Sequence, residues 1–240
     1  MTAFNFPHVA RETSGTVALV SADVPADRRE RLRRFLNVGV AGIGLLAAGP
    51  LMGGIAALIK LTSRGPIIYK QTRVGLDRRY RTRNGNSSRR SWDSGGKPFV
   101  MYKFRTMYET GAGARAEVWA QPVDPRVTPL GRVLRQYRLD ELPQLFNVLR
   151  GDMNVVGPRP EQPTIFAVLR EKIERYTERQ RVRPGITGWA QIRQRYDRSI
   201  DDVRRKVTLD LEYVARQSLL EDLKIMVRTA PVMLFKRGAW

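Results

Sequence analysis

The longest hydrophobic pattern in the chain is an uncharged run at residues 35–59, which follows a strongly basic stretch at 28–34. As a helix that rises about 1.5 Å per residue, the run would be roughly 37 Å long, which exceeds a bilayer core of about 30 Å. Gly49 and Pro50 lie near its middle and favour a break in the helix. We therefore predict a membrane-embedded segment within residues 29–62.

The charges on both sides of this segment bear on its topology. Basic residues precede it, and four more follow it closely: Lys60, Arg64, Lys70 and Arg73. The positive-inside rule places such flanks in the cytoplasm, and a re-entrant helix–break–helix hairpin satisfies that rule at both ends. A kinked helix that crosses the bilayer once would carry the same run, so the pattern leaves both topologies open. The late start and the length of the run argue against a cleaved signal peptide.

After residue 63 the hydrophobic positions form shorter patterns. Residues 66–75 and 97–105 have the composition of two short strands, which predicts a small β-sheet. An insertion rich in Arg, Ser and Gly separates them at 76–96, and we expect it to be a flexible basic loop. Contact with anionic lipid headgroups and plain solvation both suit such a loop, and the sequence leaves the two open.

The C-terminal half has helical periodicity. Apolar residues at helical spacing predict helices at 163–180 and 201–216, and a capping box at 218–221 begins a last helix. Lys224 and Arg228 accompany the apolar stripe of the last helix. This combination suits a helix that lies in the membrane interface, and it suits packing against the domain equally well.

These patterns together predict a membrane-associated α/β protein that is mostly helical. We expect a flexible tail at 1–28, a re-entrant or crossing membrane segment at 29–62, and a domain at 63–240. That domain would hold the small sheet, the basic loop and the amphipathic interfacial helices.

Two adjacent carboxylates, Asp140 and Glu141, precede a further amphipathic helix. Its apolar residues recur at helical spacing and Gly151 ends it; they are Leu142, Leu145, Phe146 and Leu149. At the N-cap position, Asp140 is expected to accept backbone N–H bonds and to stay ionised, and the same terminus suits a bound phosphate. By themselves these residues favour a plain helix cap with a solvated neighbour over a catalytic pair.

Composition narrows the chemistry that the chain can perform. The net charge of +20 implies a polyanionic partner, which is a nucleic acid, an anionic membrane surface or a phosphorylated substrate. The chain has no cysteine, and its one histidine, His8, lies in the predicted tail. This excludes thiolate chemistry, a His-based triad and a His/Cys zinc site. Carboxylates, hydroxyls and cations remain, and a metal held by their oxygens would be Mg²⁺ or Mn²⁺.

Cationic side chains at rigid turns and strand ends supply the donors that a diphosphate requires. Arg159 lies between two prolines, and Lys103 and Arg105 end a predicted strand. The full set of expected phosphate-binding residues is Lys103, Arg105, Arg135, Arg138, Arg159, Arg183 and Gln191. Guanidinium groups bind phosphate oxygens in a bidentate manner, and a divalent ion would offset the remaining charge.

The order of these segments resembles the bacterial sugar transferase family. Its members are monotopic polyprenol-phosphate phosphoglycosyl transferases that begin exopolysaccharide or glycoconjugate assembly. The resemblance rests on five stretches in the family's order: 65–75, 102–107, 138–153, 156–161 and 183–191. It extends from about residue 29 to the C-terminus.

The resemblance implies a specific reaction. Family members move a sugar-1-phosphate from a UDP-sugar to polyprenol (undecaprenyl) phosphate and release UMP through a phosphosugar–aspartyl intermediate. The family's nucleophile matches Asp140, and its Mg²⁺-associated glutamate matches Glu141, so these two would also hold the metal. Its phosphate-binding arginines match Arg135 and Arg159.

The resemblance also implies a location and a topology. It favours the re-entrant hairpin at the bacterial inner (cytoplasmic) membrane, with the catalytic domain on the cytoplasmic face. UDP-sugar, polyprenol phosphate and the anionic membrane surface are the expected partners, and nucleic acid is not. A homodimer is compatible with the sequence, and the identity of the sugar is not determined by it.

The chain departs from the family pattern near the membrane. Asn37 replaces an aspartate that usually follows a basic pair, which predicts a weaker attachment of the hairpin. Gly49 replaces a frequent serine before Pro50, and the insertion at 76–96 is longer than usual. An alternative function is that of a non-catalytic, membrane-tethered basic module that binds anionic lipid or nucleic acid. A multi-pass transferase is not expected, because the chain has one long apolar run.

Overall fold

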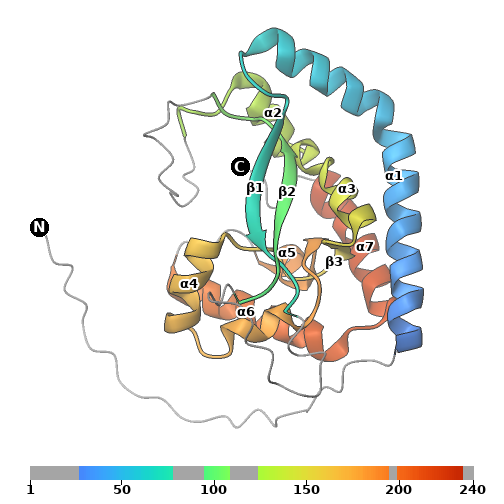
Figure 1. The fold of residues 1–240 in the computed structure, drawn as a ribbon, viewed down its shortest axis with the longest axis vertical. Helices are drawn as coiled ribbons and strands as arrows, with labels where there is room; N and C mark the ends of the chain where they lie inside the picture. The colour runs from blue at the N-terminus through green and yellow to red at the C-terminus, as the bar shows by residue number, and fades with distance from the viewer. Residues whose placement is uncertain (1–26, 78–94, 109–123, 195–198, 235–240) are drawn as a thin grey trace, which may run out of the picture.

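The fold was examined in a computed structural model that describes residues 27–77, 95–108, 124–194 and 199–234. A long helix, α1 (Asp27–Thr62), lies along one side of the domain, and a two-stranded sheet runs beside it (Figure 1). The predicted tail at 1–28 and the loop at 76–96 fall mostly outside the described residues.

Helix α1 corresponds to the predicted membrane segment. It remains helical through Pro50, so the predicted break takes the form of the bend that Figure 1 shows between the blue and cyan parts. Proline removes one helix hydrogen bond and crowds the preceding turn, which accounts for the bend. Side chains such as Leu46, which is 82% exposed, form an apolar surface. Within the described residues, α1 is the one helix long and apolar enough to cross a membrane.

The predicted sheet is present. Strands β1 (Ile68–Val74) and β2 (Pro98–Phe104) pair antiparallel, with Ile68 opposite Phe104. Phe99 and Met101 of β2 pack in a buried core with Ala41 of α1 and with Val148. A second pair, β3 (Asn154–Val156) and β4 (Gly185–Thr187), is parallel and was not predicted from the sequence.

The helix expected to begin at Asp140 is built differently. Helix α2 (Pro129–Gln136) leads into a 3₁₀ turn, η2 (Leu139–Glu141), and helix α3 (Gln144–Arg150) begins only after Pro143. Pro143 occupies the N-cap position, so the prediction that Asp140 caps this helix is wrong. Gly151 ends α3 with a φ of 84°, as predicted.

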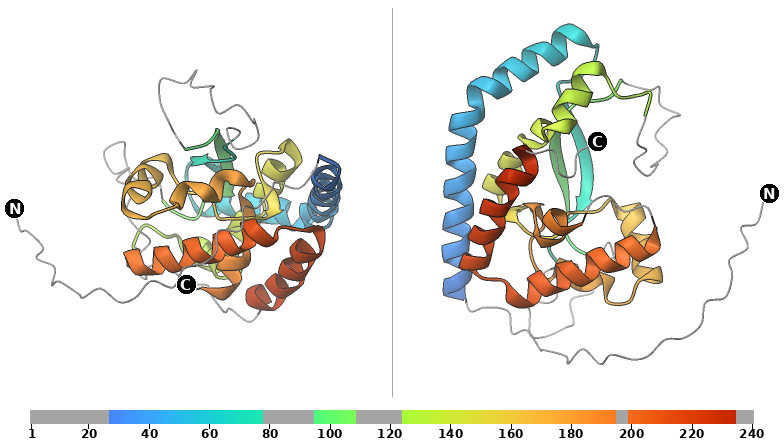
Figure 2. Two further views of the ribbon diagram at one scale, coloured as in Figure 1. Left: turned by 90° about the horizontal axis from the view of Figure 1, so that it is seen from below. Right: turned by 180° about the vertical axis from the view of Figure 1, so that it is seen from behind.

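The C-terminal half carries the remaining helices. The predicted helix at 163–180 is divided into α4 (Pro163–Lys172) and a 3₁₀ helix, η3 (Tyr176–Arg181). After α5 (Trp189–Arg193) come α6 (Ile200–Arg216) and α7 (Leu219–Leu234), and the side chain of Ser218 accepts the expected bond from the backbone of Glu221. Figure 2 shows α7 beside the N-terminal part of α1.

The N-terminal part of α1 is tied to the domain by buried polar contacts. Arg33 donates to Asp222 of α7 at 2.8 Å and to the Tyr213 hydroxyl of α6 at 3.0 Å. Asn37 accepts from the backbone N–H of Val155 in β3, and its amide donates to the carbonyl of Arg33 in α1. Asn37 therefore joins α1 to β3 through its amide oxygen, while its amide N–H group bonds within α1.

The C-terminal end of α1 is held as well. Arg105, which follows β2, donates from Nη2 to the carbonyl and the hydroxyl of Ser63, both at 2.8 Å. These bonds satisfy polar groups at the end of a helix, where carbonyls lack partners within the helix. Both ends of α1 are thus bonded to the same domain.

Candidate active site

The acidic pair lies in the η2 turn, next to the end of β2. Arg138, just before this turn, has a left-handed backbone with a φ of 54°, which is uncommon for a residue with a side chain. Backbone strain of this kind gathers at functional sites. The turn buries both carboxylates, leaving 7% of Asp140 and 6% of Glu141 exposed.

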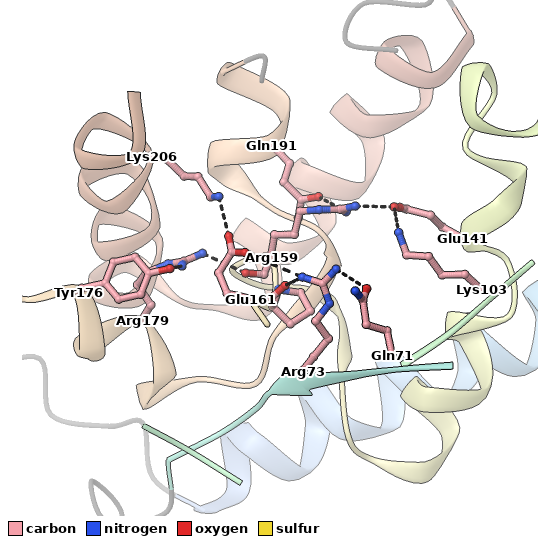
Figure 3. Close-up of polar contacts among 11 residues, drawn as sticks. Gln71, Arg73, Lys103, Glu141, Arg159, Glu161, Tyr176, Arg179, Gln191 and Lys206 are labelled. Carbon is pink, nitrogen blue, oxygen red and sulfur yellow. Dashed lines mark hydrogen bonds and ion pairs between the residues drawn. The ribbon is translucent and has the colours of Figure 1, made fainter. Parts of the chain in front are cut away.

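Glu141 is held by three cations. Its Oε1 accepts from Lys103 Nζ at 3.1 Å and from Arg159 Nη2 at 2.7 Å, as Figure 3 shows. Arg138 Nη1 lies 3.8 Å from the other oxygen. Burial by itself would raise the pKa of Glu141, but Arg159, Lys103 and Arg138 together lower it well below the ordinary value. Glu141 is therefore firmly ionised and oriented.

Asp140 has the opposite environment. Among the described residues, no hydrogen bond or ion pair reaches its carboxylate. Burial raises the pKa of Asp140, and the nearby charges of Lys103, Arg135 and Arg159 oppose that rise only in part. The expectation that backbone N–H bonds keep this group ionised is therefore wrong. A more basic carboxylate with unoccupied lone pairs is what a nucleophile requires.

The structure brings four of the expected cations to this pair: Lys103, Arg135, Arg138 and Arg159. Burial lowers the pKa of Lys103, and Glu141 offsets this in part. Arg135 of α2 donates from Nε to the hydroxyl of Thr106 at 3.0 Å. That bond fixes the guanidinium while leaving its other N–H groups for a ligand.

Two expected phosphate-binding arginines are engaged elsewhere. Arg105 bonds Ser63 at the end of α1, and only 5% of it is exposed. Arg183 donates to the carboxylate of Glu30 at 2.8 Å and to the carbonyl of Gly151 at 3.1 Å, so it also serves the attachment of α1. The structure does not bring these two to the acidic pair.

Gln191 lies at the edge of the site. Its amide oxygen is 3.4 Å from Arg159 Nη1 in the orientation drawn in Figure 3. With oxygen and nitrogen exchanged, the amide would donate to the carbonyl of Ile186 and accept from the N–H of Gly188. Two good backbone bonds outweigh one long contact, so we assign Gln191 a role in fixing the turn that follows β4.

The site extends further than the sequence analysis placed it. Arg73, Glu161, Lys206 and Arg179 form a second charged layer behind Arg159 (Figure 3). Arg73 and Glu161 lie within the motif stretches noted above, so their sequence context carried a signal. Lys206 and Arg179 lie in helical segments whose charges resemble an ordinary solvated surface.

The oxygen atoms of the acidic pair suit a magnesium ion whose remaining ligands are waters and substrate phosphates. In the part of the chain that the structure describes, no three His, Cys, Asp or Glu side chains gather as a ready metal cage. Mg²⁺ commonly binds through one or two carboxylates together with waters and substrate phosphates. Asp140 has free oxygens for such a role, whereas both Glu141 oxygens already face cations.

Comparison with known proteins identifies the family. The model of the bacterial sugar transferase family matches residues 28–236. The chain is 41% identical to the undecaprenyl-phosphate glucose phosphotransferase of Komagataeibacter xylinus, over 87% of this chain and 37% of that protein. It is 39% identical to the UDP-N-acetylgalactosamine-undecaprenyl-phosphate N-acetylgalactosaminephosphotransferase of Aeromonas hydrophila, over 87% of this chain and 45% of that protein.

A shorter relative is matched over most of its length. The UDP-glucose:undecaprenyl-phosphate glucose-1-phosphate transferase of Caulobacter vibrioides is 38% identical, over 87% of this chain and 72% of that protein. This chain spans less than half the length of the first two relatives. Because the family model covers nearly all of the chain, this protein belongs to the bacterial sugar transferase family.

Proposed function

We propose that this protein transfers a sugar-1-phosphate from a UDP-sugar to undecaprenyl phosphate and releases UMP. The observation that carries the proposal is the contrast between two adjacent buried carboxylates: Glu141 is bound by cations, while Asp140 is not hydrogen-bonded by any described residue. The relatives from Aeromonas hydrophila and Caulobacter vibrioides are named for the transfer of a sugar phosphate to undecaprenyl phosphate. This step would begin the assembly of an exopolysaccharide or another glycan.

In the first half-reaction, an oxygen of Asp140 attacks the β-phosphorus of the UDP-sugar. A bond forms between that oxygen and phosphorus, the bond from phosphorus to the bridging oxygen breaks, and UMP leaves with the electron pair. The raised pKa of Asp140 favours this attack, because a more basic oxygen is a better nucleophile. Lys103, Arg135 and Arg159 stabilise the charge that develops on the phosphoryl oxygens.

In the second half-reaction, an oxygen of undecaprenyl phosphate attacks the same phosphorus. The bond to Asp140 breaks, the carboxylate is restored, and the phosphosugar leaves on the lipid. Because one carboxylate serves both steps, the two substrates need not occupy the site together.

Asp140 would supply the protein oxygen that holds the divalent cation, because both Glu141 oxygens already face cations. When bound, Mg²⁺ would add positive charge beside the diphosphate and assist the departure of UMP. Asp140 has two oxygens available for ligation and attack, and Glu141 remains fixed by Lys103 and Arg159.

For the membrane segment, we propose the re-entrant topology. Arg33 attaches the beginning of α1 to the domain, and Arg105 attaches its end to the same domain. A helix whose two ends are bonded to one domain cannot deliver those ends to opposite sides of a bilayer unless the attachments break. The bend of α1 in Figure 1 and the basic flanks support entry and exit through the cytoplasmic face.

A panel of UDP-sugars tests the proposed activity. The full chain in a membrane mimic, given undecaprenyl phosphate and Mg²⁺, is expected to release UMP with at least one donor, such as UDP-glucose or UDP-N-acetylgalactosamine. Absence of UMP with every donor would overturn the proposal and favour the non-catalytic module, which predicts salt-sensitive binding of nucleic acid or anionic lipid.

The covalent route has its own test. Without the lipid acceptor, the enzyme is expected to release about one UMP per active site and to gain the mass of one sugar phosphate on the peptide that contains Asp140. Asp140→Asn should abolish both signals. Asp201→Asn, at an exposed carboxylate paired with Arg204, serves as the matched control and should retain both. Near-normal UMP release by Asp140→Asn would contradict the covalent route.

A further inference from the structure

The loop that carries Arg159 is short of hydrogen-bond donors. It connects β3 to α4 and contains Pro158 and Pro160, and Pro163 begins α4. A proline has no N–H group, so a segment with several prolines has more acceptors than donors. Its carbonyls must therefore find donors elsewhere in the molecule.

Those donors are all present. Five consecutive carbonyls, from residue 158 to residue 162, each accept a hydrogen bond within 3.0 Å. Three of the donors are backbone N–H groups, from Gly185, Val74 and Phe166. The donors to the second and third carbonyls are guanidinium groups: Arg179 bonds the carbonyl of Arg159, and Arg73 bonds that of Pro160, both at 3.0 Å. The loop is thus bonded along its whole length.

Arg179 is itself held rigidly. Its side chain is completely buried, its Nε donates to Asp210 of α6 at 2.7 Å, and its Nη1 donates to the Tyr176 hydroxyl at 2.9 Å. The guanidinium also lies 5.1 Å from the centre of the Tyr176 ring. The ring in turn packs against Phe166 of α4. A buried guanidinium with these partners has almost no freedom to move.

The neighbouring Glu161 fixes the loop from the other side. Its Oε1 accepts from Lys206 of α6 at 2.9 Å, and its Oε2 lies 3.9 Å from Arg73. Arg73 is oriented by the amide oxygen of Gln71 at 2.6 Å (Figure 3). Helix α6 therefore contributes two charged side chains, Asp210 and Lys206, to the support of one loop.

The bonded carbonyl and the functional side chain belong to the same residue. The carbonyl of Arg159 accepts from Arg179, while its guanidinium reaches Glu141 at 2.7 Å. A displacement of Arg179 would shift the Cα atom of Arg159, and the long side chain would carry that shift to the acidic pair. Misplacement by about 1 Å can reduce a rate roughly 100-fold.

We infer that Arg179 is a positioning residue: held by Asp210 and Tyr176, it sets the location of Arg159 and thereby of the phosphate that Arg159 binds. The inference rests on the proposed function in one respect, which is that Arg159 meets the phosphate of the substrate. The hydrogen bonds that hold the loop do not depend on that assumption. Arg179 touches neither the acidic pair nor, in this proposal, the substrate.

Arg179→Lys is the informative variant, because lysine keeps the charge but cannot bond Asp210, Tyr176 and the carbonyl of Arg159 at once. We expect kcat/KM for UMP release to fall about 10- to 100-fold. Arg175→Lys is the matched control: Arg175 lies in the same segment, is exposed and pairs with Glu178. The control should keep kcat/KM within about twofold of the wild type.

A double-mutant cycle separates positioning from a general loss of stability. If Arg179 acts through Arg159, then Arg179→Lys added to Arg159→Lys should lower kcat/KM much less than it does in the wild type. Fully additive effects of the two substitutions on kcat/KM would overturn the inference.

Hydrogen exchange gives a readout that does not depend on the reaction. The amides of Gly185 and Val74, which donate to the loop carbonyls of Pro158 and Glu161, should exchange faster in Arg179→Lys than in Arg175→Lys. Unchanged exchange in both variants would overturn the inference. If the wild type releases no UMP with any donor, the proposed function fails, and the exchange measurement alone decides the role of Arg179.

Discussion

Arg33 of α1 donates to Asp222 of α7 at 2.8 Å, although 189 positions separate the two residues in the chain. Both side chains are less than 10% exposed. The Tyr213 hydroxyl accepts from Arg33 and donates to Asp222, so the three groups form a closed, buried set. This contact joins the apolar helix to the last helix of the domain.

Removing one partner of this buried pair should destabilise the protein strongly. Arg33→Met would leave Asp222 buried without its cation, which typically costs about 3–5 kcal/mol. Thermal unfolding in a membrane mimic measures the effect. Arg204→Met, which breaks an exposed pair with Asp201, is the matched control and should cost less than about 1 kcal/mol. Equal shifts in Tm for the two variants would contradict the assigned importance of Arg33.

Asp140→Asn should stabilise the fold while it abolishes activity. Burial raises the pKa of Asp140 in the folded state, so ionisation of this group at neutral pH opposes folding. Asparagine removes that charge at nearly constant shape, and Tm at pH 7 should rise. UMP release should fall on the order of a thousandfold or more, as expected for loss of a nucleophile.

The pH dependence of Tm tests the sign of this effect. The stabilisation by asparagine should be largest at neutral pH, where Asp140 is ionised, and should shrink as the pH falls through the raised pKa of Asp140 in the folded state. A lower Tm for Asp140→Asn at pH 7 would contradict the prediction that the ionised carboxylate of Asp140 destabilises the folded state.

Glu161 should contribute acid-sensitive stability. Burial alone would raise the pKa of Glu161, but Lys206 and Arg179 outweigh it and lower it from 4.5 to about 2. A lowered carboxyl pKa adds stability above the unfolded value, and this contribution is lost as the pH falls from about 4.5 to about 2. Glu161→Gln should therefore flatten the dependence of Tm on pH in this window. An unchanged slope would show that Lys206 and Arg179 do not hold Glu161 ionised.

Cysteine labelling tests the topology of α1 directly. The chain has no cysteine, so Ala26→Cys and Arg64→Cys each introduce a single reactive thiol. In the re-entrant topology, an impermeant thiol reagent should label both variants from the cytoplasmic side. Labelling of the two variants from opposite sides of the membrane would rule that topology out. Labelling in detergent controls for the accessibility of each thiol.

The local patterns of the sequence predicted most of the elements. The uncharged run became α1, and the two strand patterns became β1 and β2 with nearly the expected bounds. The error at Asp140 has a local cause, because Pro143 takes the N-cap position and leaves the acidic pair in a separate turn. Strands β3 and β4 escaped prediction because three residues are too few to show a periodic pattern.

The site was predictable in its residue types but not in its contacts. Asp140, Glu141 and Arg159 gather as expected, whereas Arg105 and Arg183 bond the two ends of α1 instead. Arginines that bind phosphate and arginines that cap helix carbonyls look alike in a sequence. Arg179 was overlooked for a related reason: its partner Asp210 lies 31 positions away, and neither residue belongs to a recognisable local motif.

The bond from Arg105 to Ser63 has a consequence for the lipid substrate. It links the end of the apolar helix to the strand on which Lys103 lies two residues earlier. In the proposed topology, the reacting carboxylate then stands at a fixed height above the bilayer. If Asp140 carries the phosphosugar as proposed, an acceptor lipid would have to bring its phosphate to that level, and the reach of its headgroup would then decide whether it can react.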